Sequence, residues 1–228
     1  MKKKYALALV LMALCLTEAA TAQIIIGPRI GVGGRMMGRP RPRQQQRPAP
    51  KQTQPKFEPS INLSIGYGFP NLDKNYLPQY YNAYAGSSSQ QGPWIGSLDY
   101  QFSRSMSIGV LVTHGMVSAP YYDNSSASVP AFTGKLDNWS YMLNLVHYLP
   151  AASTKVLPYV RTAIGVNSWT QTYTDASGNK APVVPVDLPD LAYQVGIGAK
   201  FNVSKNAGFF VEAGYGKYIL QGGLALKF

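Results

Sequence analysis

The stretch Ser60-Ile61-Asn62-Leu63-Ser64-Ile65-Gly66-Tyr67-Gly68-Phe69 alternates strictly between apolar residues and small or polar residues. A period of two sends successive side chains to opposite faces of a β-sheet, so this stretch predicts a strand with one apolar and one polar face. The residues on its apolar face are Ile61, Leu63, Ile65, Tyr67 and Phe69. A pattern of this kind is typical of a sheet that separates two different media.

The same alternation returns seven times along the chain. The further strands are predicted at about 93–102, 106–116, 139–149, 156–167, 191–202, 209–216 and 220–228. None of the eight apolar faces carries Asp, Glu, Lys or Arg, whereas the opposite faces carry Asp99, Arg161, Lys200, Glu212 and Lys227. A charge-free outer row suits lipid, because an Arg or Lys at the bilayer midplane costs about 2–4 kcal/mol. The sequence therefore predicts an all-β fold over residues 59–228, an eight-stranded antiparallel up-and-down transmembrane β-barrel.

The rival architecture is a soluble barrel that holds a ligand, with apolar residues inside and charges outside. That assignment would wrap a soluble protein in Ile, Leu, Val and Phe, which is an aggregation hazard. Gly, Asn, Ser or charge interrupts every later apolar run well short of 18 residues, so no transmembrane helix is predicted. Because only helices and closed barrels satisfy all backbone groups in lipid, the alternation favours the membrane barrel.

Aromatic residues and connection lengths predict the orientation. The connections 70–92, 117–138 and 168–190 are long and polar, and 103–105, 150–155 and 203–207 are short. Long loops of such barrels face outward and short turns face the periplasm, which places both termini on the periplasmic side. Aromatic girdles are expected at both interfaces. Trp94, Trp139, Tyr193 and Tyr215 lie toward the long connections, and Phe102, Phe201, Phe209 and Phe228 lie at the opposite strand ends.

The N-terminal residues predict export. Lys2, Lys3 and Lys4 precede a short apolar stretch, and Ala20-Thr21-Ala22 forms a small-x-small site, so residues 1–22 are expected to be a signal peptide. Residues 23–58 hold eight basic residues against one acidic residue and are rich in Pro, Arg and Gln. We expect a flexible periplasmic segment, either a solvated linker or a contact for an anionic envelope partner such as lipid phosphate or cell-wall polymer. Export makes nucleic acid a poor partner.

The sequence offers little for catalysis or metal binding. Cys15, the only cysteine, falls within the predicted signal peptide. His114 and His147 are the only histidines, both fall on apolar rows, and neither has the spacing of a catalytic or metal-binding motif. We expect no enzymatic activity and no cofactor.

The predicted inward charges suggest pairs across the lumen. Arg161 and Glu212 lie on the fifth and seventh strands, and the strand between them carries Gly196 and Gly198, which leave room for long side chains. Since an unpaired buried charge is costly, we expect an Arg161–Glu212 pair, with Asp99 and Lys200 as a second pair. The competing interpretation is a water-filled lumen in which each charge is solvated.

Three motifs resemble the small outer-membrane β-barrel family that includes the OmpA transmembrane domain, OmpX, OmpW and opacity-type proteins. They are Pro158-Tyr159-Val160-Arg161 leading into Gly165, Gly196-Ile197-Gly198-Ala199-Lys200-Phe201, and Leu224-Ala225-Leu226-Lys227-Phe228. The resemblance covers about residues 60–228. It implies a cell outer-membrane location among phospholipid and lipopolysaccharide, and it makes Leu224, Leu226 and Phe228 the signal read by the barrel-assembly machinery.

Two functions follow from these expectations. The first is a structural or interaction protein whose outer loops contact surfaces or an envelope protein partner. Tyrosine, a favoured contact residue, is frequent in those loops: Tyr76, Tyr80, Tyr81, Tyr84, Tyr121, Tyr122 and Tyr173. The second is a narrow passage for small or hydrophobic molecules, although the interior of an eight-stranded barrel is only wide enough for side chains to fill.

Overall fold

The computed structural model describes residues 57–77, 84–151, 153, 155–180 and 187–228. The chain divides into the units Met1–Gln52 and Thr53–Phe228, and all described residues belong to the second unit. The predicted signal peptide and residues 23–56 of the basic segment lie outside the described residues. In the described part of the chain, no helix is long and apolar enough to cross a membrane.

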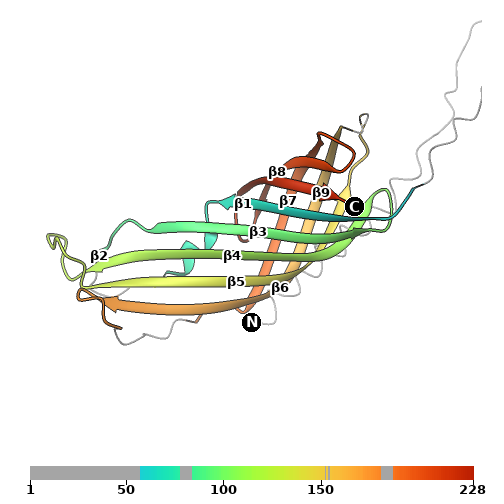
Figure 1. Ribbon diagram of the computed structural model, residues 1–228. Helices are drawn as coiled ribbons and strands as arrows, with labels where there is room; N and C mark the ends of the chain where they lie inside the picture. Colours follow the sequence, from blue (N-terminus) through green and yellow to red (C-terminus); the bar gives the residue numbers. More distant parts are fainter. Residues whose placement is uncertain (1–56, 78–83, 152, 154, 181–186) are drawn as a thin grey trace, which may run out of the picture. The chain divides into compact units, whose positions relative to one another are not determined.

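The described residues form antiparallel strands and one short 3₁₀ helix (Figure 1). In chain order the elements are β1 Ser60–Phe69, η1 Leu72–Tyr76, β2 Tyr84–Ala85, β3 Ser89–Gln101, β4 Met106–Tyr122, β5 Phe132–Tyr148, β6 Val156–Asp175, β7 Leu191–Asn202, β8 Ala207–Tyr215 and β9 Leu220–Lys227.

Strand pairing closes the sheet into a barrel. Each long strand pairs antiparallel with its neighbours in the order β4, β3, β1, β9, β8, β7, β6, β5, and pairing of β4 with β5 completes the circle. The two-residue strand β2 pairs with β4 beyond the end of β3, so it continues the course of β3 and adds no ninth stave. The last residue is part of the closure, because Ile61 and Phe228 exchange two backbone hydrogen bonds of 3.0 and 2.9 Å. The predicted eight-stranded antiparallel barrel is confirmed.

Side chains alternate between lumen and exterior as the sequence pattern predicts. In β1, Ser60, Asn62, Gly66 and Gly68 are buried, and the five apolar residues between them are exposed. Because a strand rises only about 3.4 Å per residue, the five exposed apolar side chains of β1 form a continuous stripe on the outside. The outward rows of all eight long strands together form an apolar belt. On β3 and β5 this belt ends at Trp94 and Trp139.

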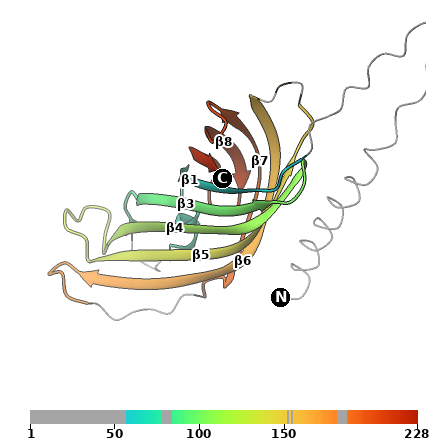
Figure 2. The same cartoon turned by 45° about the vertical axis from the view of Figure 1, so that its right-hand side comes forward.

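The strands β4, β5 and β6 are longer than predicted. We expected loops over 117–138 and 168–190, but β4 runs to Tyr122, β5 begins at Phe132 and β6 runs to Asp175. These residues form the strand extension, defined as 115–122, 132–138 and 168–175, which projects past the ends of β7, β8 and β9 (Figures 1 and 2). The prediction failed because the boundaries were set where apolar residues leave the outward face, although the alternation continues with its polarity exchanged.

That exchange of polarity separates the strand extension from the belt. The outward face of the strand extension consists mainly of hydroxyl and charged side chains, namely Ser118, Thr133, Lys135, Asp137, Ser168, Thr170, Thr172 and Thr174. Its inward face is mainly apolar beyond the buried Asn138, and the buried hydrophobic residues there are Val117, Ala119, Tyr121, Leu136 and Tyr173. The belt has the opposite arrangement, so the outward rows of the same three strands change from apolar to polar side chains near Trp139.

Candidate functional site

The expected contact between Arg161 and Glu212 is formed inside the barrel. Arg161 Nε lies 3.3 Å from Glu212 Oε2, and both side chains are buried. The contact is an ion pair without hydrogen-bond geometry at Nε. Tyr159 donates a hydrogen bond of 2.9 Å to Oε2 of Glu212, and Tyr218 donates one of 2.9 Å to Oε1. The buried Glu212 carboxylate is therefore surrounded by one cation and two phenol hydroxyls.

The strand β7 makes room for this cluster because it carries two glycines on its inward row. A Cβ on Gly196 would lie 2.7 Å from Glu212 Oε1, and a Cβ on Gly198 would lie 2.7 Å from the Tyr159 hydroxyl. These distances are shorter than van der Waals contact, so any larger residue would displace the carboxylate or the phenol. The glycines thus have the packing role that the sequence predicts.

The second predicted pair is wrong. Lys200 Nζ donates to Asn62 Oδ1 at 3.1 Å, and the Asp99 carboxylate accepts from Asn144 at 2.6 Å and from Ser97 at 2.9 Å. Lys200 on β7 is bound by the Asn62 amide of β1, and Asp99 on β3 is bound by the Asn144 amide of β5 and by the Ser97 hydroxyl of its own strand, so each charge is engaged with neutral groups. The inward row also contains Lys227, which is half-buried near the end of β9.

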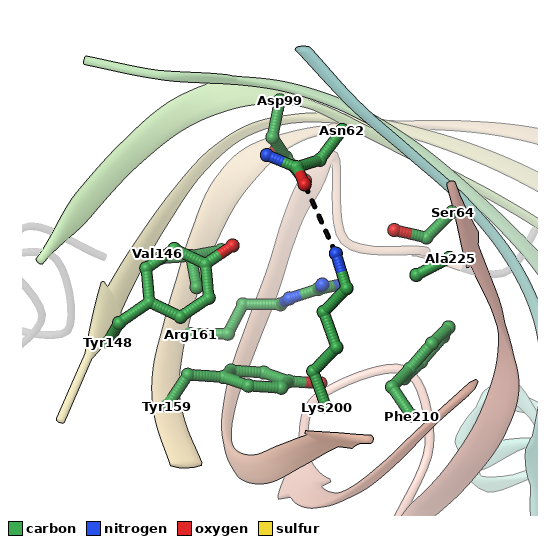
Figure 3. Close-up of a pocket in the computed structure, with 10 residues that line it drawn as sticks. All are labelled: Asn62, Ser64, Asp99, Val146, Tyr148, Tyr159, Arg161, Lys200, Phe210 and Ala225. Atoms are coloured by element: carbon green, nitrogen blue, oxygen red, sulfur yellow. Dashed lines mark hydrogen bonds between the residues drawn. The ribbon is translucent and has the colours of Figure 1, made fainter. Parts of the chain in front are cut away.

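Asp99, Arg161 and Lys200 line a small cavity with Asn62, Tyr148 and Tyr159 (Figure 3). The side chains of Arg161 and Lys200 point into this space, and the dashed line in the figure marks the Lys200–Asn62 hydrogen bond. Its volume is about 20 Å³, room for about one water molecule. This part of the lumen is therefore lined by charged side chains and has no room for a larger solute.

A second buried ion pair closes the lumen toward the strand extension. Lys217 Nζ lies 2.6 Å from Asp73 Oδ1, and Asn138 Nδ2 donates to Asp73 Oδ2 at 3.0 Å. Lys217 also donates to Asn167 Oδ1 at 3.2 Å and lies 5.2 Å from the centroid of the Trp169 ring. Between this cluster and the Glu212 cluster lies an apolar layer formed by Ile95, Leu111, Met142, Ala163, Ala192 and Tyr218.

Two connections between strands enter the barrel to form this closure. Asn71 caps the N-terminus of η1, where its side chain accepts from the backbone N–H of Asp73, and Leu72 N–H donates to the Lys217 carbonyl at 3.1 Å. In the β8–β9 connection, Gly216 has φ +141°, and a Cβ there would collide with the Tyr193 carbonyl. Glycine at this position lets the following Lys217 and Tyr218 side chains turn into the lumen.

The Asp73–Lys217 pair was not predicted from the sequence. Both residues lie outside the alternating stretches, in connections between predicted strands. Burial lowers the pKa of Lys217, while the Asp73 carboxylate opposes that change. The one available signal in the sequence is Gly216 next to Lys217, because glycine permits a sharp turn between the last two predicted strands.

The predicted aromatic residues face outward at the two ends of the belt. Trp94, Trp139, Tyr193 and Tyr215 are exposed toward the strand extension, and Phe102, Phe209 and Phe228 are exposed at the other end. Phe201 is half-exposed and stacks on Phe209 with ring centroids 4.8 Å apart. Leu224 and Leu226, the other predicted assembly residues, face outward with Phe228.

The two histidines also lie on outward rows. His114 Nε2 lies 3.0 Å from Asp137 Oδ1, and the His114 ring stacks on Trp139 with centroids 4.2 Å apart. His147 is half-exposed near the C-terminal end of β5. In the described part of the chain, no group of three or more His, Cys, Asp or Glu side chains could hold a metal ion.

The tyrosines predicted to be loop contacts have different environments. Tyr76 and Tyr84 are exposed, and Tyr122 is half-exposed. Tyr121 and Tyr173 are buried on the inward face of the strand extension, so the prediction that they lie in exposed loops is wrong. Tyr80 and Tyr81 lie outside the described residues.

No protein-family model and no curated protein matches the sequence. Among solved structures, a de novo designed transmembrane β-barrel is similar at 16% identity and a TM-score of 0.38, over 74% of this chain and 95% of that one. Ail, the attachment invasion locus protein of Yersinia pestis, is similar in its complex with the heparin analogue sucrose octasulfate, at 14% identity and a TM-score of 0.41, over 75% of this chain and 97% of that one. A second structure of Ail gives 13% identity and a TM-score of 0.37.

Proposed function

We propose that this chain is an integral β-barrel of a Gram-negative outer membrane that serves as a structural or interaction protein through its outer end. The observation that carries the proposal is the charge distribution. The outward rows of the belt hold no Asp, Glu, Lys or Arg, whereas Asp99, Arg161, Lys200 and Glu212 are buried in the lumen. Lipid around the belt explains this arrangement, because hydrocarbon solvates the apolar rows and excludes charge.

The lumen supports a closed barrel rather than a passage. Two buried ion pairs and an apolar layer occupy its length, and the cavity beside Arg161 has room for about one water molecule. A solute would have to break the Arg161–Glu212 and Asp73–Lys217 contacts. Arg161 with Glu212 and Asp73 with Lys217 are engaged in ion pairs, and Asp99 and Lys200 are engaged with neutral side chains, which favours a non-enzymatic role.

The outer end is the part that would meet partners. By the rule that short turns face the periplasm, the connections 102–105, 149–155 and 203–206 lie inside the envelope and the strand extension lies outside the cell. We also propose that the chain is related to the OmpA-like and OmpX-like small barrels. In addition, we propose that the barrel-assembly machinery recognises Leu224, Leu226 and Phe228, which predicts a lower outer-membrane level of the Phe228→Ser variant.

Two measurements test the proposal. Folded protein in mild detergent should change its mobility on gels after boiling, because every strand of the closed sheet is paired. In planar bilayers it should give no conductance steps above the empty membrane. Recovery in the soluble periplasmic fraction would contradict membrane insertion, and regular conductance steps would contradict the closed lumen.

A further inference from the structure

The outward face of the strand extension is an ordered array of polar side chains. Strand register places Ser118, Lys135 and Thr172 side by side, and in the row below it places Met116, Asp137 and Thr170 side by side. The strand β3 extends the upper row with Ser89, whose hydroxyl lies 2.9 Å from that of Ser118. Neighbours in such an array are about 4.8 Å apart across strands and about 7 Å apart along them.

The array is continuous with the belt. Its lowest row contains Trp94, His114, Trp139 and Ser168, paired in that order across four strands. Trp94 and Trp139 are exposed, and tryptophan rings favour the level of lipid headgroups. From Trp139 to Thr133 the outward row rises about 20 Å along the strand. A lipid whose chains lie against the belt therefore has its headgroup directly against this array.

We propose that this array binds the core oligosaccharide of the lipopolysaccharide molecules that surround the barrel. The inference rests on the proposed function, which places the belt in an outer membrane with the strand extension outside. Hydroxyl side chains both donate and accept hydrogen bonds, which matches the donor and acceptor hydroxyls of sugars. Ser168, Thr170, Thr172 and Thr174 supply four such groups in one row along β6.

The charges on the array distinguish sugar from phosphate as its ligand. Lys135 is the one lysine on the outward face of the strand extension, and Asp137 is engaged with His114. A site for a strongly anionic group usually gathers several cations or a bidentate arginine. The nearly neutral, hydroxyl-rich array fits an oligosaccharide better than the phosphates of lipid A.

The array lies on a sheet whose opposite face is packed. The opposite face of the same strands buries Val117, Tyr121, Leu136 and Tyr173, and the rings of Tyr121 and Phe132 are stacked with centroids 5.0 Å apart. Side chains held on a packed sheet lose less conformational freedom on binding than side chains on a free loop. The strand extension is thus a preformed surface beside the lipid.

The test compares full-length protein folded into vesicles that contain lipopolysaccharide with its complete core or lipid A alone, at equal molar content. We expect a higher denaturant midpoint with the complete core. The double variant Thr170→Val and Thr172→Val removes two hydroxyls with little change of shape, and it should lose at least half of that difference. Thr162→Val makes the same change on the outward row of β6 within the belt and should keep the whole difference.

The conservative variant Thr170→Ser with Thr172→Ser retains the hydroxyls and should restore the wild-type difference. Equal midpoints of the wild type in the two vesicles would overturn the proposal, and an equal rise over phospholipid vesicles would assign the contact to phosphate and Lys135. Retention of the full difference by the double valine variant would also overturn it. Failure of the wild type to insert into any of these vesicles would instead contradict the proposed function.

Discussion

The belt and the strand extension are built from the same three strands, yet their side chains have opposite arrangements. Leu143 and Val166 face outward in the belt, where Asn144 and Arg161 face the lumen. In the strand extension, Thr170 faces outward and Leu136 is buried. A β-strand has one period but no fixed polarity, so the alternation records whichever medium lies on each side. Under the proposed function, the exchange near Trp139 marks the upper edge of the surrounding lipid.

The largest effect is expected from a charge deleted inside the belt. Glu212→Gln leaves Arg161 buried without a counter-charge, which should lower the free energy of unfolding by about 3–5 kcal/mol. Reversible denaturant unfolding in vesicles measures it. The double variant Arg161→Met and Glu212→Gln should recover most of the loss, since it removes the stranded charge. Additive losses would show that the two side chains act independently and that water solvates the lumen.

A charge added to the outward row should distinguish the two regions directly. Leu143→Arg places a cation near the middle of the belt and should cost about 2–4 kcal/mol. Thr133→Arg makes a similar change on the same strand within the strand extension and should cost less than about 0.5 kcal/mol. Both values come from denaturant unfolding in the same vesicles. Equal costs would contradict the assignment of lipid to one region and water to the other.

The comparison also explains what the sequence could predict. The strands, the inward charges and the Arg161–Glu212 pair follow from a period of two, because alternation fixes the face of every residue once one face is known. The strand extension was not predicted, because the outward rows stop being apolar at Trp139. Thr170 and Thr172, which lie beyond that point, were therefore predicted to be loop residues. The Asp73–Lys217 pair was missed for another reason: it joins two connections, and no local pattern predicts that connections fold back into a lumen.

An intermediate effect is expected in the small core of the strand extension. Leu136→Ala removes a buried side chain and should cost about 2 kcal/mol locally. Because the belt keeps its own hydrogen-bonded closure, the loss should open the strand extension without unfolding the barrel. Hydrogen exchange should rise in residues 132–138 and 168–175, while the gel mobility of the unboiled protein stays unchanged. Thr133→Ala, on the outward face of the same strand, is the control and should leave exchange unaltered. Exchange that rises equally across β1 and β9 would contradict separate stability of the two regions.

The smallest effect should locate the boundary between the two regions. His114 and Asp137 interact at 3.0 Å on the outward face, next to Trp139, and each is about 30% exposed. An ion pair or hydrogen bond that water can reach is worth about 0–1 kcal/mol, whereas in a medium without water the loss of one partner costs several times more. We therefore expect Asp137→Asn to lower the free energy of unfolding by less than about 1 kcal/mol, with a decrease that shrinks further at high salt. A loss above about 2 kcal/mol without salt dependence would show that lipid covers this row. The edge of the belt would then lie above Asp137, and the lowest rows of the polar array would face hydrocarbon rather than sugar.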